Sequence, residues 1–167
     1  KELGQWRFTA IAGLNTLFVA LLNSADFRKL DFSSLKLTVA GGMAMQLKPA
    51  EEWEKLTGCQ VCEGFGMTET SPVVSLNPLK AIQLGTIGMP VPSTELKVVD
   101  ESGEALPVGE AGELCVRGPQ VMKGYWQREE ATAEVLDAEG WFKSGDIAVI
   151  DPDGFVRIVD RKKDMII

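Results

Sequence analysis

Strands and helices alternate through the first half of the chain, and this alternation restricts the fold more than any other feature. Buried strands are predicted at residues 8–12, 35–40 and 59–63. Apolar residues at helical spacing over 14–22 predict a helix after the first strand, and this apolar face fits core packing, ligand contact or both. A second helix is predicted to begin at about Pro49 and to be capped at its C-terminal end by Gly58. This order is typical of parallel α/β structure.

Two glycine-rich segments follow predicted strands. Gly41 and Gly42 come after the second strand, and Gly64-Phe65-Gly66 comes after the third. In open parallel sheets, ligands bind beyond the carboxyl ends of the strands. We therefore expect both segments to border a ligand site.

The second half of the chain changes character near residue 85, where short strands alternate with turn signals. Strands are predicted at residues 95–100, 112–117, 146–150 and 155–159, and one helix is predicted at 128–136. This pattern predicts a small antiparallel β-barrel or sandwich. The predicted organisation is an α/β subdomain over 1–84, a β-barrel subdomain over 85–160 and the start of a hinge over 161–167.

Charge and composition exclude several functions. The net charge is −7, so the basic footprint that a nucleic-acid partner requires is missing. The chain contains no histidine, which excludes Ser-His and Cys-His nucleophiles within these residues. Three cysteines without a secretory leader predict a reduced, cytoplasmic setting, and Cys59 and Cys62 fit two small core residues better than a redox or metal pair. No apolar run approaches the roughly 20 residues that span a bilayer.

The segment from Gly64 to Thr70 carries groups suited to nucleotide chemistry. It is not the dinucleotide fingerprint, because Glu69 stands at the third glycine position. The ring of Phe65 can stack on a base, the hydroxyl of Thr68 can bond a phosphate oxygen, and the carboxylate of Glu69 can hold magnesium. An ordinary glycine-rich turn with a solvated glutamate fits the residues equally well.

Two further charged residues stand near predicted strands of the second half. Asp146 follows a glycine at a predicted strand start, where a carboxylate can accept hydrogen bonds from ribose hydroxyls. Taken alone, it is better explained as a cap for local amides. Arg161 lies in the charged run 160–164, which is typical of solvated surface, and the functional alternative directs it at phosphate or ribose oxygens.

Four segments in this order together resemble the adenylate-forming superfamily of acyl-CoA synthetases, adenylation domains and beetle luciferases. They are FGMTE at 65–69, GELCVRG at 112–118, GWFKSGD at 140–146 and IVDRKKD at 158–164. Residues 139–163 resemble the fatty-acyl-CoA synthetase signature, and residues 31–34, 90–95 and 118–122 resemble bacterial long-chain fatty-acid–CoA ligases. The departures are Phe65, where the family usually has tyrosine, and Lys143-Ser144, where it often has His-Thr.

The resemblance implies ATP-dependent ligation of a long-chain fatty acid to CoA through an acyl-adenylate. It assigns Phe65 to adenine, Thr68 to phosphate, Glu69 to magnesium, Asp146 to the ribose hydroxyls and Arg161 to ribose or phosphate. Thr68 and Glu69 would be catalytic. The glycines Gly64 and Gly66 would complete the nucleotide site, Gly41, Gly42 and Met43 would separate adenine from the acyl chain, and Lys163 would be a hinge.

The resemblance also implies that the sequence is part of a longer protein and is inactive alone. The phosphate loop and the C-terminal domain with its catalytic lysine would lie elsewhere. The expected location is cytoplasmic, and a peripheral contact with the inner face of the membrane and a homodimer stay open. The alternatives are an aryl-CoA ligase, an amino-acid adenylation domain or a non-catalytic nucleotide-binding module. The depth and polarity of the pocket around residues 8–22 would separate the first two from a fatty-acid enzyme.

Overall fold

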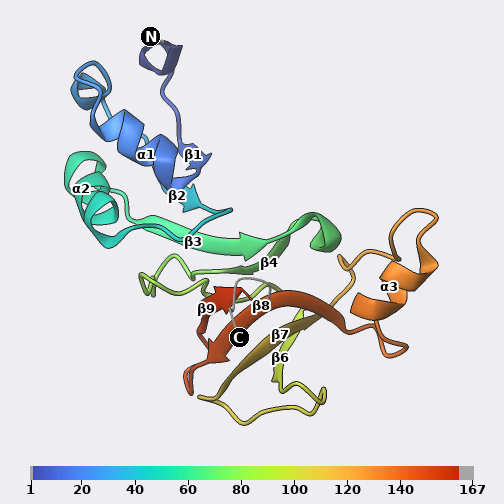
Figure 1. Cartoon of the computed structure of the whole chain (residues 1–167). Helices are drawn as coiled ribbons and strands as arrows, with labels where there is room; N and C mark the ends of the chain where they lie inside the picture. Colours follow the sequence, from blue (N-terminus) through green and yellow to red (C-terminus); the bar gives the residue numbers. More distant parts are fainter. Residues whose placement is uncertain (1, 162–167) are drawn as a thin grey trace.

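The computed structural model describes residues 2–161, which form two sheets that pack against each other (Figure 1). The first sheet has five strands in the order β1-β2-β3-β4-β5, and the second has four in the order β6-β7-β8-β9. The predicted hinge residue Lys163 lies outside the described residues. Within the described part of the chain, no helix is long and apolar enough to cross a membrane.

The first sheet confirms the predicted parallel α/β subdomain. Its parallel part contains β1 (Ala10–Gly13), α1 (Asn15–Leu22), β2 (Leu37–Ala40), α2 (Leu47–Thr57) and β3 (Val61–Gly66). The antiparallel strands β4 (Val73–Leu76) and β5 (Met89–Pro90) extend it. Short 3-10 turns are η1 (Glu2–Gln5), η2 (Phe27–Lys29) and η3 (Thr68–Thr70).

The core of this subdomain lies between the two helices and the parallel strands. Trp53 of α2 is fully buried and contacts the rings of Phe18 and Phe27, with ring centroids 4.7 and 5.4 Å away. The Trp53 indole N–H donates to the hydroxyl of Thr38 in β2 over 3.0 Å. A buried polar group needs such a partner, so this bond fixes α2 over the sheet.

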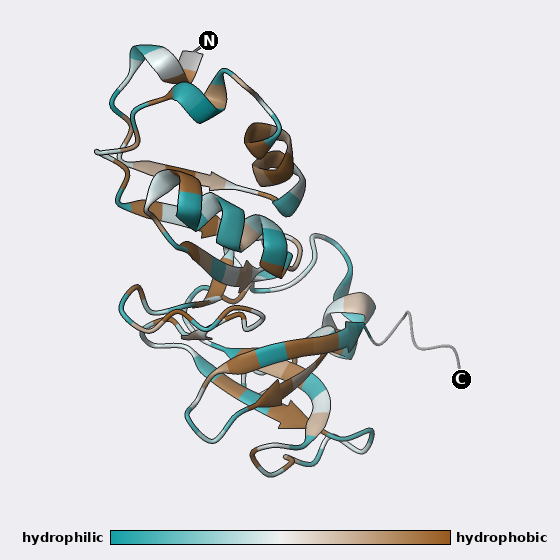
Figure 2. Cartoon of the chain, turned by 90° about the vertical axis from the view of Figure 1, so that its left-hand side faces the viewer, coloured by the Kyte–Doolittle hydropathy of each residue, from teal (hydrophilic) through white to brown (hydrophobic). Residues whose placement is uncertain are grey.

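The apolar face predicted over residues 14–22 divides between the core and the surface. Phe18 and Leu22 are buried, whereas Leu14 and Leu17 are 47% and 42% exposed. α1 is apolar along most of its length, whereas α2 has a polar outer side (Figure 2). α1 therefore packs on the core and also presents apolar side chains at the carboxyl end of β1.

The helix α2 lies close to its predicted bounds. α2 ends at Gly58 as predicted, and this cap has a left-handed φ of 71°. The start was predicted at about Pro49, and the helix begins two residues earlier at Leu47, so the proline is its third residue. That position is tolerated, since the first backbone N–H groups of a helix have no partner within the helix.

Cys62 is a buried core residue and Cys59 is half-buried, and both are free thiols.

The segment Gly64-Phe65-Gly66 was predicted as a loop and is instead the second half of β3. β3 pairs in parallel with β2 through residues 61–63 and then antiparallel with β4 through 64–66. A Cβ on Gly66 would overlap the carbonyl group of Pro72, and one on Gly64 would lie 2.8 Å from Leu76 Cδ1. These glycines therefore allow the close approach of β4.

The second sheet confirms the predicted antiparallel strands, which form an open four-stranded sheet. Its strands are β6 (Glu95–Val99), β7 (Ala111–Arg117), β8 (Phe142–Ile150) and β9 (Val156–Arg161), and α3 (Glu129–Val135) lies between β7 and β8. All neighbouring pairs are antiparallel, with β6 and β9 at the edges. β8 begins four residues earlier than predicted, so Asp146 lies inside the strand, after Gly145 with a φ of 75°.

The two sheets share contacts around the segment before β5. The Ile87 N–H donates to the Val156 carbonyl oxygen over 2.8 Å. Phe65 and Ile87 pack against a buried cluster of the second sheet, which is Leu114, Ala148 and Val156. The division at residue 85 stays a prediction, and the site described next depends on this junction.

Candidate active site

A cleft of about 440 Å³ lies between the two sheets at the carboxyl ends of β2 and β3. Seven predicted site residues line it, which are Gly42, Met43, Gly64, Phe65, Gly66, Asp146 and Arg161. They come from the loop after β2, from β3, from β8 and from the end of β9. Residues that are up to 119 positions apart in the numbering thus border one space.

Asp146 and Arg161 face each other across the β8–β9 pair. Their backbones are opposed in the strand register, and Arg161 Nε donates to Asp146 Oδ1 over 3.2 Å. The Asp146 side chain is 8% exposed and that of Arg161 is 69% exposed. Burial raises the pKa of Asp146, and the charge and hydrogen bond of Arg161 lower it less. The pair offers a ligand one buried carboxylate and one exposed cation.

Phe65 supplies the aromatic surface of the cleft. The ring is half-buried, packs against the core of the second sheet and lines the space beside Asp146. Its position on a strand fixes the side chain better than a loop would. The cleft therefore combines an aromatic ring with a carboxylate, which are suitable partners for a base and a ribose.

Glu63 is a buried carboxylate of this cleft that the sequence analysis missed. Its Oε2 accepts the Met45 N–H over 3.0 Å, and its Oε1 accepts the Gly85 N–H over 2.9 Å. It thereby connects the loop after β2 to the segment before β5, and both segments contribute residues to the cleft. The available signal was an acidic residue inside a buried strand, directly before Gly64, since such residues are rarely buried without partners.

Glu69 and Thr68 lie beside this cleft rather than in it. Glu69 lines an adjoining cleft of about 590 Å³, together with Tyr125 and Lys143. Arg161 lines both clefts, so the two spaces are neighbours. Thr68 is exposed at the start of η3. The fold thus brings Glu69 near the predicted nucleotide residues without placing it among them.

The carboxylate of Glu69 fits a magnesium ion that is shared with a phosphate ligand. Among residues 2–161 no group of three or more potential metal-binding side chains occurs. Magnesium does not need one, because it is usually held by one or two carboxylates together with substrate phosphates and water. Glu69 could therefore be the protein's contribution to such an ion.

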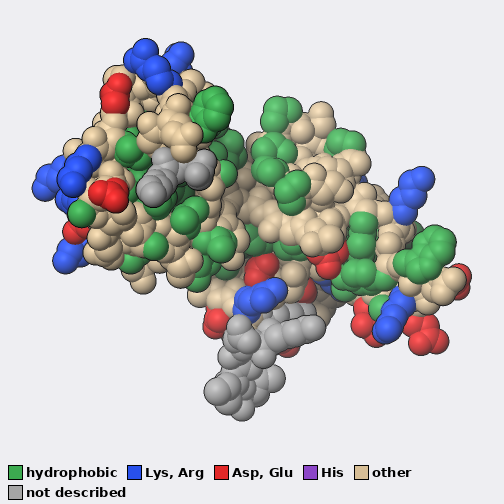
Figure 3. Space-filling view, turned by 90° about the horizontal axis from the view of Figure 1, so that it is seen from above, with side chains coloured by type: hydrophobic (Ala, Val, Ile, Leu, Met, Phe, Trp, Pro, Cys, Tyr) green, Lys and Arg blue, Asp and Glu red, His purple; other side chains and the backbone are tan. Residues whose placement is uncertain are grey.

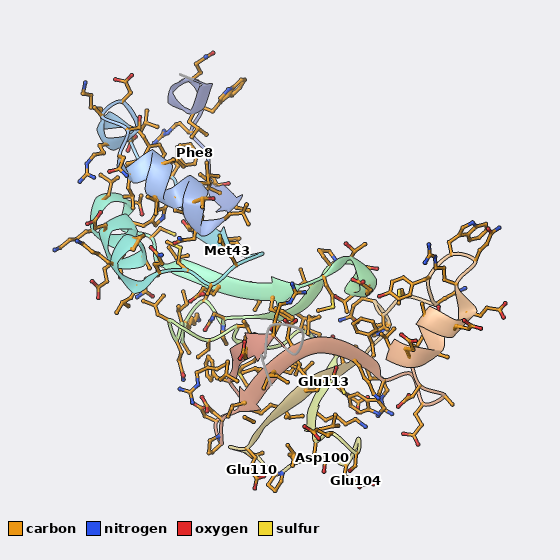
Figure 4. The ribbon with its side chains drawn as sticks, viewed as in Figure 1. Phe8, Met43, Asp100, Glu104, Glu110 and Glu113 are labelled. Carbon is orange, nitrogen blue, oxygen red and sulfur yellow. The ribbon has the colours of Figure 1, made fainter. Side chains whose placement is uncertain are left out.

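An apolar surface adjoins the cleft on the side of α1. Gly42 has a φ of 76°, and a Cβ there would lie 2.8 Å from Leu14 Cδ2, so the leucine lies against the glycine. Met43 is 49% exposed at the carboxyl end of β2 (Figure 4). Seen from above, hydrophobic side chains are spread over the part of the molecule that carries α1, on the left, and over the part that carries α3, on the right (Figure 3). Gly41 borders this surface but does not line the cleft.

An aromatic ring, a buried carboxylate and a cation beyond the carboxyl ends of parallel strands are features of a nucleotide-binding α/β protein. The family of AMP-binding enzymes matches residues 1–126. The chain belongs to this family.

Individual relatives agree with this assignment. A long-chain-fatty-acid–CoA ligase of Salmonella typhimurium is 58% identical over 100% of this chain and 30% of its own length. The crystal structure of the anthranilate CoA ligase AuaEII with anthranoyl-AMP has a TM-score of 0.91 at 30% identity, covering 99% of this chain and 32% of that one. ATP-bound MatB from Rhodopseudomonas palustris has a TM-score of 0.87 at 34% identity, covering 96% and 32%. The chain thus spans about 30% of the curated relative.

Proposed function

We propose that the full-length protein ligates a long-chain fatty acid to coenzyme A, with ATP as the activating substrate. The observation that carries this proposal is the meeting of Phe65, Asp146 and Arg161 in one cleft, beside an apolar surface. The similarity to a long-chain-fatty-acid–CoA ligase over the whole chain supports the same substrates.

The reaction has two steps with different leaving groups. A carboxylate oxygen of the acid attacks the α-phosphorus of ATP, and the bond from this phosphorus to the bridging oxygen of pyrophosphate breaks. The thiol sulfur of CoA then attacks the acyl carbon, the thiol proton is lost, and AMP leaves with its oxygen. The first step builds charge on phosphate oxygens, so fixed cations and donors lower its barrier.

The described residues divide these tasks. Phe65 would stack on adenine, Asp146 would accept the ribose hydroxyls, and Arg161 would approach ribose or phosphate oxygens. Gly64 and Gly66 would let the backbone of β3 lie close to the nucleotide. Magnesium held at Glu69 would neutralise phosphate charge, with Thr68 beside it as a hydroxyl donor.

The acyl chain would lie on the apolar surface beside the nucleotide. Gly41, Gly42 and Met43 would form the wall between the adenine and the chain, and Leu14 and Leu17 would extend the apolar side. The two leucines present apolar area in the described part of the chain, where they are 47% and 42% exposed. Covering such area stabilises a bound chain by roughly 25 cal/mol per Å².

An aryl-CoA ligase is the second candidate function. Its support is the TM-score of 0.91 with an enzyme whose crystal structure holds anthranoyl-AMP. A long-chain-fatty-acid–CoA ligase is 58% identical over the whole chain, whereas the anthranilate enzyme is 30% identical. We therefore rank the fatty acid first.

We also propose a cytoplasmic location for the protein. The three cysteines, Cys59, Cys62 and Cys115, are all free thiols, and a reducing compartment keeps thiols in this state. A peripheral contact with the membrane and a homodimer stay predictions from the resemblance.

A panel of acids tests the proposed function in the full-length protein. AMP release would be measured for fatty acids of increasing length, for benzoate-type acids and for amino acids, with and without CoA. We expect long-chain acids to give the highest kcat/KM, with AMP release dependent on CoA. Preference for an aromatic acid would favour the second candidate, and no release with any acid would reject both.

A further inference from the structure

The loop before α3 is fastened to the segment that carries Glu69. The backbone N–H of Met122 donates to the Glu69 carbonyl oxygen over 2.7 Å. The side-chain amide of Gln120 donates to the Val73 carbonyl oxygen over 3.2 Å and to Thr94 Oγ1 over 2.7 Å. The backbone around Glu69 is thus held by a loop that is distant in the sequence.

Tyr125 adds a bond to the Glu69 carboxylate itself. Its hydroxyl donates to Oε1 of Glu69 over 2.9 Å, and both side chains line the 590 Å³ cleft. The Tyr125 backbone N–H donates to the hydroxyl of Thr132 in α3 over 2.9 Å. The backbone of the tyrosine is therefore bonded to α3, while its hydroxyl is bonded to the glutamate.

The bond between Tyr125 and Glu69 joins a phenol hydroxyl to a carboxylate oxygen. A hydrogen bond to an ionised carboxylate is roughly twice as strong as one between neutral groups.

We propose that Tyr125 is a positioning residue that orients the Glu69 carboxylate for magnesium. The inference rests on the function proposed above. An ionised carboxylate has about four lone-pair sites, so a bond at Oε1 leaves capacity for a cation. Carboxylates that bind metals are themselves hydrogen-bonded, and the loss of such a partner typically costs roughly 10–100-fold in metal affinity.

The variant Tyr125→Phe tests this role in the full-length protein, because it removes the hydroxyl and keeps the ring. ATP binding would be measured by calorimetry, without acid substrate, over a series of magnesium concentrations. We expect the magnesium concentration for half-maximal binding to rise roughly 10–100-fold. Trp126→Phe is the matched control, since this neighbouring aromatic side chain is 87% exposed, and its magnesium midpoint should equal that of the wild type.

A second variant separates orientation of the carboxylate from fastening of the loop. Gln120→Ala removes two bonds of the loop without touching the Glu69 side chain, so it should lower thermal stability and leave the magnesium midpoint in place. If Gln120→Ala shifts the magnesium midpoint as far as Tyr125→Phe does, fastening of the whole loop determines the magnesium affinity, and the proposal is wrong. An unchanged midpoint in Tyr125→Phe overturns the positioning role while the proposed function stands. Absence of magnesium-dependent ATP binding in the wild type overturns both.

Discussion

Asp146 is the residue whose chemistry depends most strongly on its surroundings. Burial raises its pKa, and the mostly exposed Arg161 offsets only part of this effect. The folded protein therefore holds this proton to a higher pH than the unfolded chain does. The contribution of Asp146 to stability falls as the pH rises from the ordinary value of 3.8 through the raised pKa. The affinity for ribose should instead rise with pH, because ribose binding needs the ionised form of Asp146.

We predict that Asp146→Asn raises the free energy of unfolding at pH 7 and weakens ATP binding about tenfold. Hydrogen bonds to charged groups contribute about 1.5–3 kcal/mol, against about 0.5–1.5 kcal/mol between neutral groups. A difference of about 1.4 kcal/mol corresponds to tenfold in affinity. Denaturant unfolding and calorimetry on the full-length protein measure the two quantities.

Asp100 provides a matched control for this variant. It lies in the turn after β6, at the far end of the second sheet from the cleft (Figure 4). Its pKa is lowered, first by the hydrogen bond from the Ser102 side chain. Asp100→Asn should therefore lower stability at pH 7 and leave ATP affinity unchanged. ATP affinity of Asp146→Asn equal to the wild type would reject the ribose role.

β3 is the element that assembles the candidate site. Its first half belongs to the parallel sheet and its second half pairs with β4. This change of partner brings Glu63 and Phe65 into the cleft between the sheets. The close approach of β4 depends on Gly66, where any Cβ meets the Pro72 carbonyl group.

We predict that Gly66→Ala destabilises the protein by about 1–3 kcal/mol or more, the usual cost of forcing atoms into packed structure. The control is Gly58→Ala, where no atom lies within 4 Å and only the φ of 71° is unfavourable. That change should cost roughly 1–2 kcal/mol, the usual cost of a left-handed conformation for a residue with a Cβ. The denaturant midpoints of the full-length variants give the comparison, and a smaller loss for Gly66→Ala would contradict the account of β3.

The elements were predictable from sequence where the signals are local. Helical spacing located α1, and a glycine cap located the end of α2. The strand at Gly64-Phe65-Gly66 was missed because glycine usually interrupts strands, and its partner β4 follows only after η3. Glu63 was missed because its acceptor role depends on amides 18 and 22 residues away. Local patterns do not encode such long-range partners.

At the scale of the whole molecule, the two clefts meet at Arg161, near the end of the described chain. The predicted hinge residue Lys163 follows two positions later. A hinge must change its backbone dihedral angles between two states. Proline prevents this change, because its ring fixes φ near about −65°.

We predict that Lys163→Pro in the full-length protein preserves adenylate formation and abolishes most acyl-CoA formation. Pyrophosphate exchange and thioester yield would be measured on the same preparation, with Lys163→Ala as the control for loss of charge. A folding defect would reduce both activities together, and the melting temperature detects it. Equal loss of both activities, or loss of neither, argues against the hinge.

The central claim is that the cleft and Glu69 together form an adenylating site. The direct measurement is ATP–pyrophosphate exchange in the full-length protein with a long-chain fatty acid, for the wild type and for Glu69→Gln. This change keeps the shape of the side chain and removes its charge. We predict acid-dependent exchange in the wild type and a loss of about 100-fold or more in the variant, a typical effect of removing one key electrostatic group. Near-normal exchange by Glu69→Gln at low magnesium, or no exchange by the wild type with any acid, would contradict the account.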